Sequence, residues 1–137
     1  LEAAIRKLPK DAWFEMIAYN DSAVSFAGKL VQASSQAKSE ATRFIYSQTA
    51  EGKTDWFDAL VASLAVDPNL EAVVFLSDGE PNVGRITDPL QIVREITRLN
   101  AAQRVSIHTI GIDAHGPAEE FLKNLAADNF GVYDAIR

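Results

Sequence analysis

Residues 72–79 read Ala-Val-Val-Phe-Leu-Ser-Asp-Gly, an apolar run that ends on a carboxylate and a glycine. A run of apolar and small residues of this length is typical of a strand buried on both faces, as in a parallel sheet covered by helices. Asp78 would then lie at the carboxyl end of that strand, the edge at which open α/β sheets bind ligands. Gly79 permits a sharp turn into a loop. The stretch therefore predicts an acidic residue at a functional sheet edge, suited to a metal or phosphate site.

The composition predicts one globular domain over residues 1–137. The chain has 137 residues, of which 47% are hydrophobic, enough for a core of its own. Its net charge of −6 argues against nucleic acid as a partner. It has no cysteine, so disulfides and thiolate metal sites are excluded. No stretch approaches the roughly 18 uninterrupted apolar residues of a membrane span.

Segments with strand patterns alternate with segments of helical period. Helices are expected over residues 1–8, 37–45, 55–64, 89–99 and 117–125, and strands over residues 13–19, 22–26, 71–77, 104–112 and 131–133. The first two strands should form an antiparallel hairpin around a turn at residues 20–21. The remaining alternation predicts an α/β fold, a doubly wound and mostly parallel sheet with this one hairpin.

Four segments make the chain resemble the von Willebrand factor type A family. Gly-Lys-Thr-Asp at 52–55 is similar to the family's Gly-x-Thr segment before a helix, and residues 75–81 to its apolar strand that ends in Thr/Ser-Asp-Gly. Residues 105–112 are similar to the next strand, and residues 122–133 to the closing helix and strand. The resemblance implies a Rossmann-like three-layer sandwich.

The resemblance also implies a metal-ion-dependent adhesion site at the top of the sheet. There a divalent cation, Mg²⁺ or in its place Mn²⁺ or Ca²⁺, is held by oxygen ligands from three loops, and an Asp or Glu of a protein partner completes the shell. By motif match, Thr54 would supply a hydroxyl oxygen and Asp78 a carboxylate. Ser77, Glu80 and Asp113 are candidates for supporting these ligands. Purely structural alternatives remain open. They are Thr54 as a helix N-cap, Asp78 as a loop carboxylate that caps a turn, and Glu80 and Asp113 as solvent-exposed side chains.

One part of the family pattern is missing from the chain. The family's Asp-x-Ser-x-Ser motif lies on the first, central strand, and residues 21–25 do not reproduce its spacing. The chain is therefore interpreted as N-terminally truncated, with two of three ligand loops, and the cation is expected to be absent unless the missing ligands are supplied. Residues 13–19 and 71–77 should flank a gap with unpaired backbone groups. Upstream sequence would fill it, or another chain by strand donation or swapping.

The predicted function is that of a non-enzymatic binding module that recognises a partner carboxylate through the cation. One alternative is a metal-free scaffold domain of the same fold. Another is a phosphoryl-transfer enzyme with Asp78 as nucleophile, but this needs further strand-end acids and a lysine, and residues 104–112 lead into Asp113 with no lysine. The resemblance does not fix the compartment, and we expect an extracytoplasmic or cell-surface location.

Overall fold

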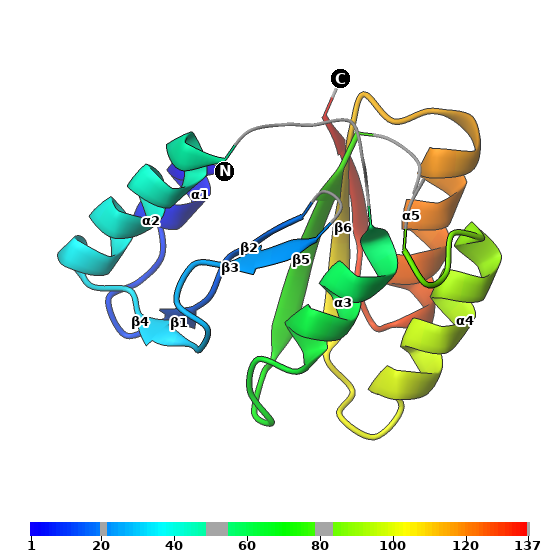
Figure 1. The fold of residues 1–137 in the computed structure, drawn as a ribbon, viewed down its shortest axis with the longest axis horizontal. Coiled ribbons are helices and arrows are strands. Elements are labelled where there is room, and N and C mark those ends of the chain that lie inside the picture. The colour runs from blue at the N-terminus through cyan, green and yellow to red at the C-terminus, as the bar shows by residue number, and fades with distance from the viewer. Residues whose placement is uncertain (20–21, 49–54, 79–83, 137) are drawn as a thin grey trace.

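The computed structural model of the chain describes residues 1–19, 22–48, 55–78 and 84–136 (Figure 1). Its elements are, in order, α1 (Glu2–Arg6), β1 (Trp13–Phe14), β2 (Ile17–Tyr19), β3 (Ala23–Ser25), β4 (Val31–Gln32), α2 (Ser35–Ser47), α3 (Trp56–Leu64), β5 (Ala72–Ser77), α4 (Pro89–Asn100), β6 (Ser106–Ile112), α5 (Gly116–Asp128) and β7 (Tyr133–Ile136). None of the helices in this part of the chain is long and apolar enough to cross a membrane.

A parallel sheet of three strands, in the order β5-β6-β7, forms the centre of the fold. Ser77 lies opposite Gly111 in the β5–β6 pair, and Thr109 lies opposite Tyr133 in the β6–β7 pair. Helices α4 and α5 make the crossovers that parallel neighbours require. This alternation confirms the predicted α/β class.

Helices α3, α4 and α5 lie together on one side of this sheet (Figure 1). The start of α4 follows the sequence signal, because the Asp88 side chain accepts a hydrogen bond from the Leu90 amide and Pro89 takes the first turn. The core between these helices and the sheet contains Trp56, Phe57, Leu60, Leu64, Phe75, Ile92, Val93, Ile96, Val105, Ile107, Ala114, Phe121, Leu122 and Leu125.

The N-terminal part of the chain differs from the prediction. The expected strand 13–19 is split: β1 pairs with β4, and only β2 pairs with β3 as a hairpin. Glu15 explains the break, because its carboxylate accepts hydrogen bonds from the Met16 and Ala27 amides, which removes them from a continuous ladder. Helices α1 and α2 pack on each other, and Ile5, Phe14, Ala33 and Ala41 form a second small core there.

The apolar run of β5 predicts a strand buried on both faces, but in the structure one face of β5 is largely exposed. Phe75 and Ser77 are buried, whereas Val74 is 55% exposed. Within the described residues, β5 pairs only with β6, so its other edge has no strand partner. β2 approaches that edge through one side chain, since the Tyr19 hydroxyl donates a hydrogen bond to the Leu76 carbonyl at 2.6 Å. The predicted gap between residues 13–19 and 71–77 is therefore present in this part of the structure.

Candidate functional site

Two acidic residues lie at the carboxyl edge of the parallel sheet. Asp78 follows β5 and Asp113 follows β6, and both side chains are exposed. Because Ser77 and Gly111 are register partners, the two acids leave the sheet at the same edge. Asp113 has a positive φ of 51°, and its amide donates a hydrogen bond to the Ile136 carbonyl, which fixes the turn after β6. The sequence prediction of acids at this edge is confirmed.

Two of the predicted site residues, Thr54 and Glu80, lie outside the described residues. Within the described part, no three side chains of His, Cys, Asp or Glu come together as a metal cluster. Asp78 presents an exposed carboxylate, the kind of ligand that a hard cation prefers, whereas its neighbour Ser77 is buried and bonds Tyr19. Asp78 matches the oxygen chemistry of Mg²⁺, but by itself it supplies fewer ligands than that ion requires.

The N-cap of α3 is Asp55, and not Thr54. The Asp55 carboxylate accepts a hydrogen bond from the Asp58 amide at 3.0 Å. The capping alternative that the sequence left open for Thr54 is therefore wrong. Asp55 is only 4% exposed, and this burial raises the pKa of its carboxyl, against the opposing effect of the Asp58 amide.

Tyr19 is a site residue that the sequence reasoning missed. Its ring stacks on Phe75 with centroids 5.3 Å apart, and its hydroxyl reaches the carboxyl end of β5. Burial raises the pKa of this phenol well above its usual range; a hydrogen bond with Ser77 opposes the rise, and the negative charge of Asp78 adds to it. Tyr19 therefore remains a protonated donor beside Asp78. Its only signal in the sequence is its place at the end of the predicted strand.

Gly84 and Arg85, which come just before α4, lie against the first turn of α3. Both Nε and Nη2 of Arg85 donate to Asp58 Oδ1, at 3.0 and 2.9 Å. The Arg85 guanidinium also lies 5.0 Å from the centroid of the Phe57 ring. A Cβ on Gly84 would approach the Asp55 Oδ1 atom to 2.4 Å, so this backbone touches the buried carboxylate. Gly84 and Arg85, the first described residues after Asp78, therefore contact the N-terminal turn of α3.

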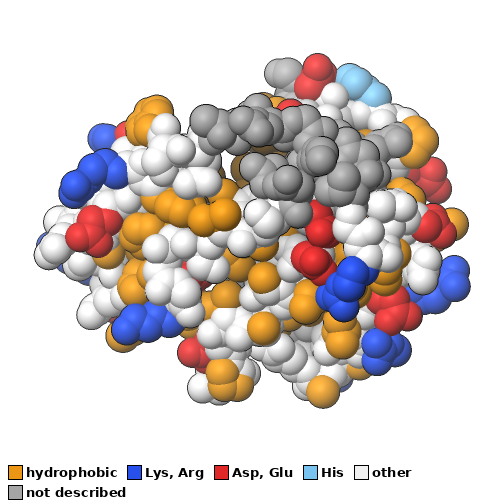
Figure 2. Space-filling view, viewed as in Figure 1, with side chains coloured by type: hydrophobic (Ala, Val, Ile, Leu, Met, Phe, Trp, Pro, Cys, Tyr) orange, Lys and Arg blue, Asp and Glu red, His pale blue; other side chains and the backbone are white. Residues whose placement is uncertain are grey.

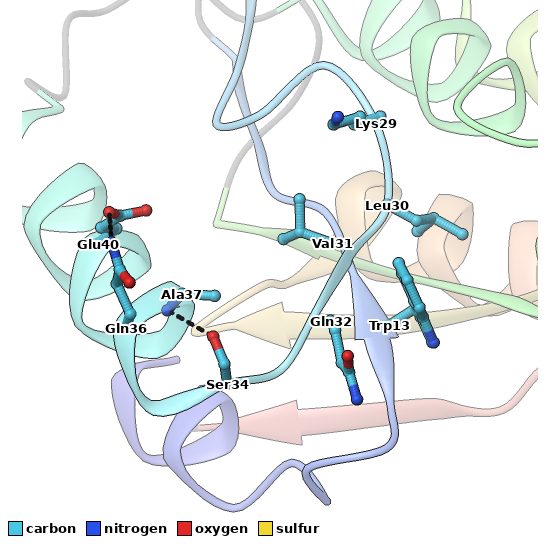
Figure 3. Close-up of a pocket in the computed structure, with 9 residues that line it drawn as sticks. All are labelled: Trp13, Lys29, Leu30, Val31, Gln32, Ser34, Gln36, Ala37 and Glu40. Atoms are coloured by element: carbon cyan, nitrogen blue, oxygen red, sulfur yellow. Dashed lines mark hydrogen bonds between the residues drawn. The ribbon is translucent and has the colours of Figure 1, made fainter.

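An open groove of about 540 Å³ lies away from this edge, beside β1, β4 and the start of α2 (Figure 3). Trp13, 61% exposed, forms one wall. The polar groups of the opposite wall bond locally: Ser34 Oγ accepts from the Ala37 amide, and Glu40 accepts from Gln36. The candidate site therefore remains at the carboxyl edge of the sheet.

Comparison with known families identifies this architecture. Residues 1–135 match the model of the von Willebrand factor type A domain. The chain belongs to that family. Von Willebrand factor type A domains are a family of protein-interaction modules.

The relatives of this von Willebrand factor type A domain are longer proteins. It is 28% identical over 121 residues to human von Willebrand factor A domain-containing protein 3A, covering 88% of this chain and 10% of that protein. It is 24% identical over 134 residues to human inter-alpha-trypsin inhibitor heavy chain H2, covering 90% of this chain and 14% of that protein. Thus the chain spans less than a sixth of either relative's length.

A solved structure shows the same fold. The von Willebrand factor type A structure from Catenulispora acidiphila superposes with a TM-score of 0.80 at 20% sequence identity. The match covers 99% of this chain and 32% of that one. At this identity, the likeness shows the fold alone.

Proposed function

We propose that this domain is a non-enzymatic binding module that recognises an Asp or Glu of a protein partner through a divalent cation. Thr54 and Asp78 would hold the cation, Mg²⁺ or Mn²⁺, with Ser77, Glu80 and Asp113 in supporting positions. One observation carries the proposal. Asp78 is an exposed carboxylate at the carboxyl end of β5, in a domain whose family consists of interaction modules.

The residues around Asp78 have separate roles in this proposal. A bound cation would supply an open coordination position for a partner carboxylate. Asp78 contributes negative charge, and Tyr19 holds the end of β5 through the Leu76 carbonyl. The buried Ser77 keeps the strand end packed, so Asp78 starts from a fixed backbone position. The phosphoryl-transfer alternative has less support, since the strand β6 leads into Asp113 with no lysine to balance the charge of a phosphoryl group.

Calorimetric titration of Mg²⁺ and Mn²⁺ tests this function. A chain that also carries the missing Asp-x-Ser-x-Ser loop should bind with a Kd between about 10 µM and a few mM, the range of modest oxygen-ligand sites, whereas residues 1–137 alone, with two of three ligand loops, should not saturate in this range. The double variant Thr54→Ala, Asp78→Ala should lose this binding, because both predicted oxygen ligands are removed. Asp128→Ala is the control, since it removes an exposed carboxylate at the C-terminal end of α5. Equal heats in wild type and double variant of the longer chain would overturn the proposal.

We also propose that the open edge of β5 accepts a strand donated from outside residues 1–137. The supporting observation is that β5 pairs with β6 alone among the described strands. In a strand paired on one side only, alternate amides lack a ladder partner. Hydrogen exchange monitored by NMR should therefore find fast and slow amides alternating along residues 72–77. Uniform protection of all these amides would show that the edge is already closed.

A further inference from the structure

We propose that the Tyr19 side chain is a latch on the open edge of β5, and that it is released when an extended apolar segment pairs with that edge. Its hydroxyl donates a hydrogen bond to the Leu76 carbonyl at 2.6 Å, so it occupies an acceptor that an incoming strand would use. The inference rests on the strand acceptance proposed above, and it names the contact that the edge must give up before it can pair.

The direction of the backbone groups places the Leu76 carbonyl on the open edge. The Ser106 amide of β6 donates a hydrogen bond to the Glu71 carbonyl at 3.1 Å, so the backbone groups of Glu71 point toward β6. Along a strand, the N–H and C=O groups of successive residues point to opposite sides. Alternation from Glu71 therefore turns residues 73, 75 and 77 toward β6 and leaves residues 72, 74 and 76 facing away from it. The phenol contact at Leu76 agrees with this assignment.

The latch crosses the space that a new strand would fill. β2 and β5 belong to different sheets, and no backbone ladder joins them in the described parts of the chain. The Tyr19 side chain connects the two strands instead, with its ring centroid 5.3 Å from that of Phe75 and its hydroxyl on Leu76. A segment paired with β5 would lie about 4.8 Å from it, the usual spacing of neighbouring strands. Such a segment would have to displace the Tyr19 side chain.

The hairpin that carries the latch is held less firmly than β5. β2 and β3 form a two-stranded sheet of their own, in which β2 is half-buried and every residue of β3 is exposed. Phe75 of β5, in contrast, is 5% exposed and belongs to the main core. Local opening costs least where few apolar groups are buried. The hairpin, and not β5, should therefore move when the latch is released.

The surface beside the open edge favours an apolar partner. Val74 on β5 is 55% exposed, and Val24 on β3 is 45% exposed. Figure 2 shows hydrophobic side chains at the surface in the middle of the view, where Figure 1 places β2, β3 and β5. A sheet edge binds an extended peptide mainly through main-chain hydrogen bonds, and alternate side chains add specificity. The edge therefore fits an extended segment with apolar side chains.

Titration of a strand peptide into the ¹⁵N-labelled chain, followed by NMR, tests the latch. The probe is a synthetic copy of residues 71–78, Glu-Ala-Val-Val-Phe-Leu-Ser-Asp, which combines an apolar centre with acidic ends that favour solubility. Tyr19→Phe removes only the hydroxyl and keeps the ring. This variant should bind the probe about tenfold more tightly than wild type, because pairing no longer has to break one hydrogen bond.

Tyr46→Phe is the matched control for the loss of a phenol hydroxyl. The Tyr46 hydroxyl donates a hydrogen bond to Glu2 at 2.6 Å, the same distance as in the latch, but the side chain is 74% exposed and belongs to α2. Its removal should change the probe affinity by less than about twofold, since exposed substitutions have small effects.

Hydrogen exchange locates the bound probe and separates the two proposals. In Tyr19→Phe the probe should slow the exchange of the amides of residues 72, 74 and 76, which face the open edge. Val74→Pro removes one of these amides and no bond to β6, as an edge strand permits, so its addition to Tyr19→Phe should weaken probe binding. If the probe protects the edge of both proteins but binds Tyr19→Phe no more tightly than wild type, the latch is overturned and strand acceptance stands. If the probe protects the edge in neither protein, strand acceptance fails and the latch fails with it.

Discussion

Replacing Trp56 with alanine should lower the free energy of unfolding by about 3–5 kcal/mol, the range for large aromatic side chains removed from a core. Trp56 is fully buried at the start of α3. It stacks on Phe121 with ring centroids 4.2 Å apart, and the edge of one ring meets the face of the other where it contacts Phe75 at 6.0 Å. Through these two ring contacts, Trp56 joins α3 to both α5 and β5. Urea unfolding followed by circular dichroism measures the loss.

The chemistry of Trp56 supplies a sharp control. Among the described residues its buried Nε1 atom makes no well-formed hydrogen bond, although it lies close enough to the Tyr19 hydroxyl to lower the pKa of that phenol, so Trp56→Phe keeps most of the packing and gives up little polar contact. We expect this variant to lose less than half as much stability as Trp56→Ala. Trp13→Ala, at a site 61% exposed, should change stability by only about 0.5 kcal/mol. A similar loss for Trp56→Ala and Trp13→Ala would contradict the packing argument.

The elements with local signals were predictable from the sequence. The cap and proline at Asp88 and Pro89 place the start of α4, and the structure begins that helix at Pro89. The apolar runs of β5 and β6 are strands in parallel register, as their alternation with helices required. Signals of this kind arise from neighbouring residues, so a single sequence contains them.

The features that were predicted wrongly or missed depend on contacts between segments far apart in the sequence. The break at Glu15 follows from a hydrogen bond to Ala27, and the exposure of Val74 follows from α1 and α2 packing on each other away from that face. Tyr19 reaches Leu76 across 57 positions of sequence. No periodicity indicates such a contact.

Only the position of the candidate site, at the carboxyl edge of the sheet, was predictable from the sequence. Asp78 and Asp113 were placed correctly because the carboxyl ends of parallel strands meet at one edge. The identity of the α3 cap could not be predicted from the sequence, since Thr54 and Asp55 are both good capping residues. Only the hydrogen bond from the Asp58 amide distinguishes them. The contact between Gly84 and Asp55 likewise needed the folded backbone.

Removing the Asn100 side chain should have the second large effect on stability, because this buried amide links the end of α4 to the residue just before β6. Its side chain donates to the Val105 carbonyl at 2.8 Å and accepts from the Val105 amide at 2.8 Å. It also donates a hydrogen bond to Asn129 Oδ1. The Asn129 amide in turn donates hydrogen bonds to Thr97 Oγ1 and to the Leu125 carbonyl. Both asparagines are 1% exposed. The network therefore joins α4, α5 and the approach to β6 in a water-excluded place.

Asn100→Ala should lower the free energy of unfolding by about 2–4 kcal/mol, because it leaves the Val105 amide and carbonyl buried without partners at roughly 1–3 kcal/mol each, less any relief by entering water. Asn69→Ala is the control, since Asn69 is exposed and its change should fall within about 0.5 kcal/mol. Val105 hydrogen exchange gives a second reading, which should accelerate in Asn100→Ala beyond the change in global stability. If both asparagine variants unfold at the same urea concentration, the hydrogen-bond network does not hold α4 to the sheet. The apolar core alone would then have to fix the α4 crossover, which brings Asp78 and Asp113 to one edge.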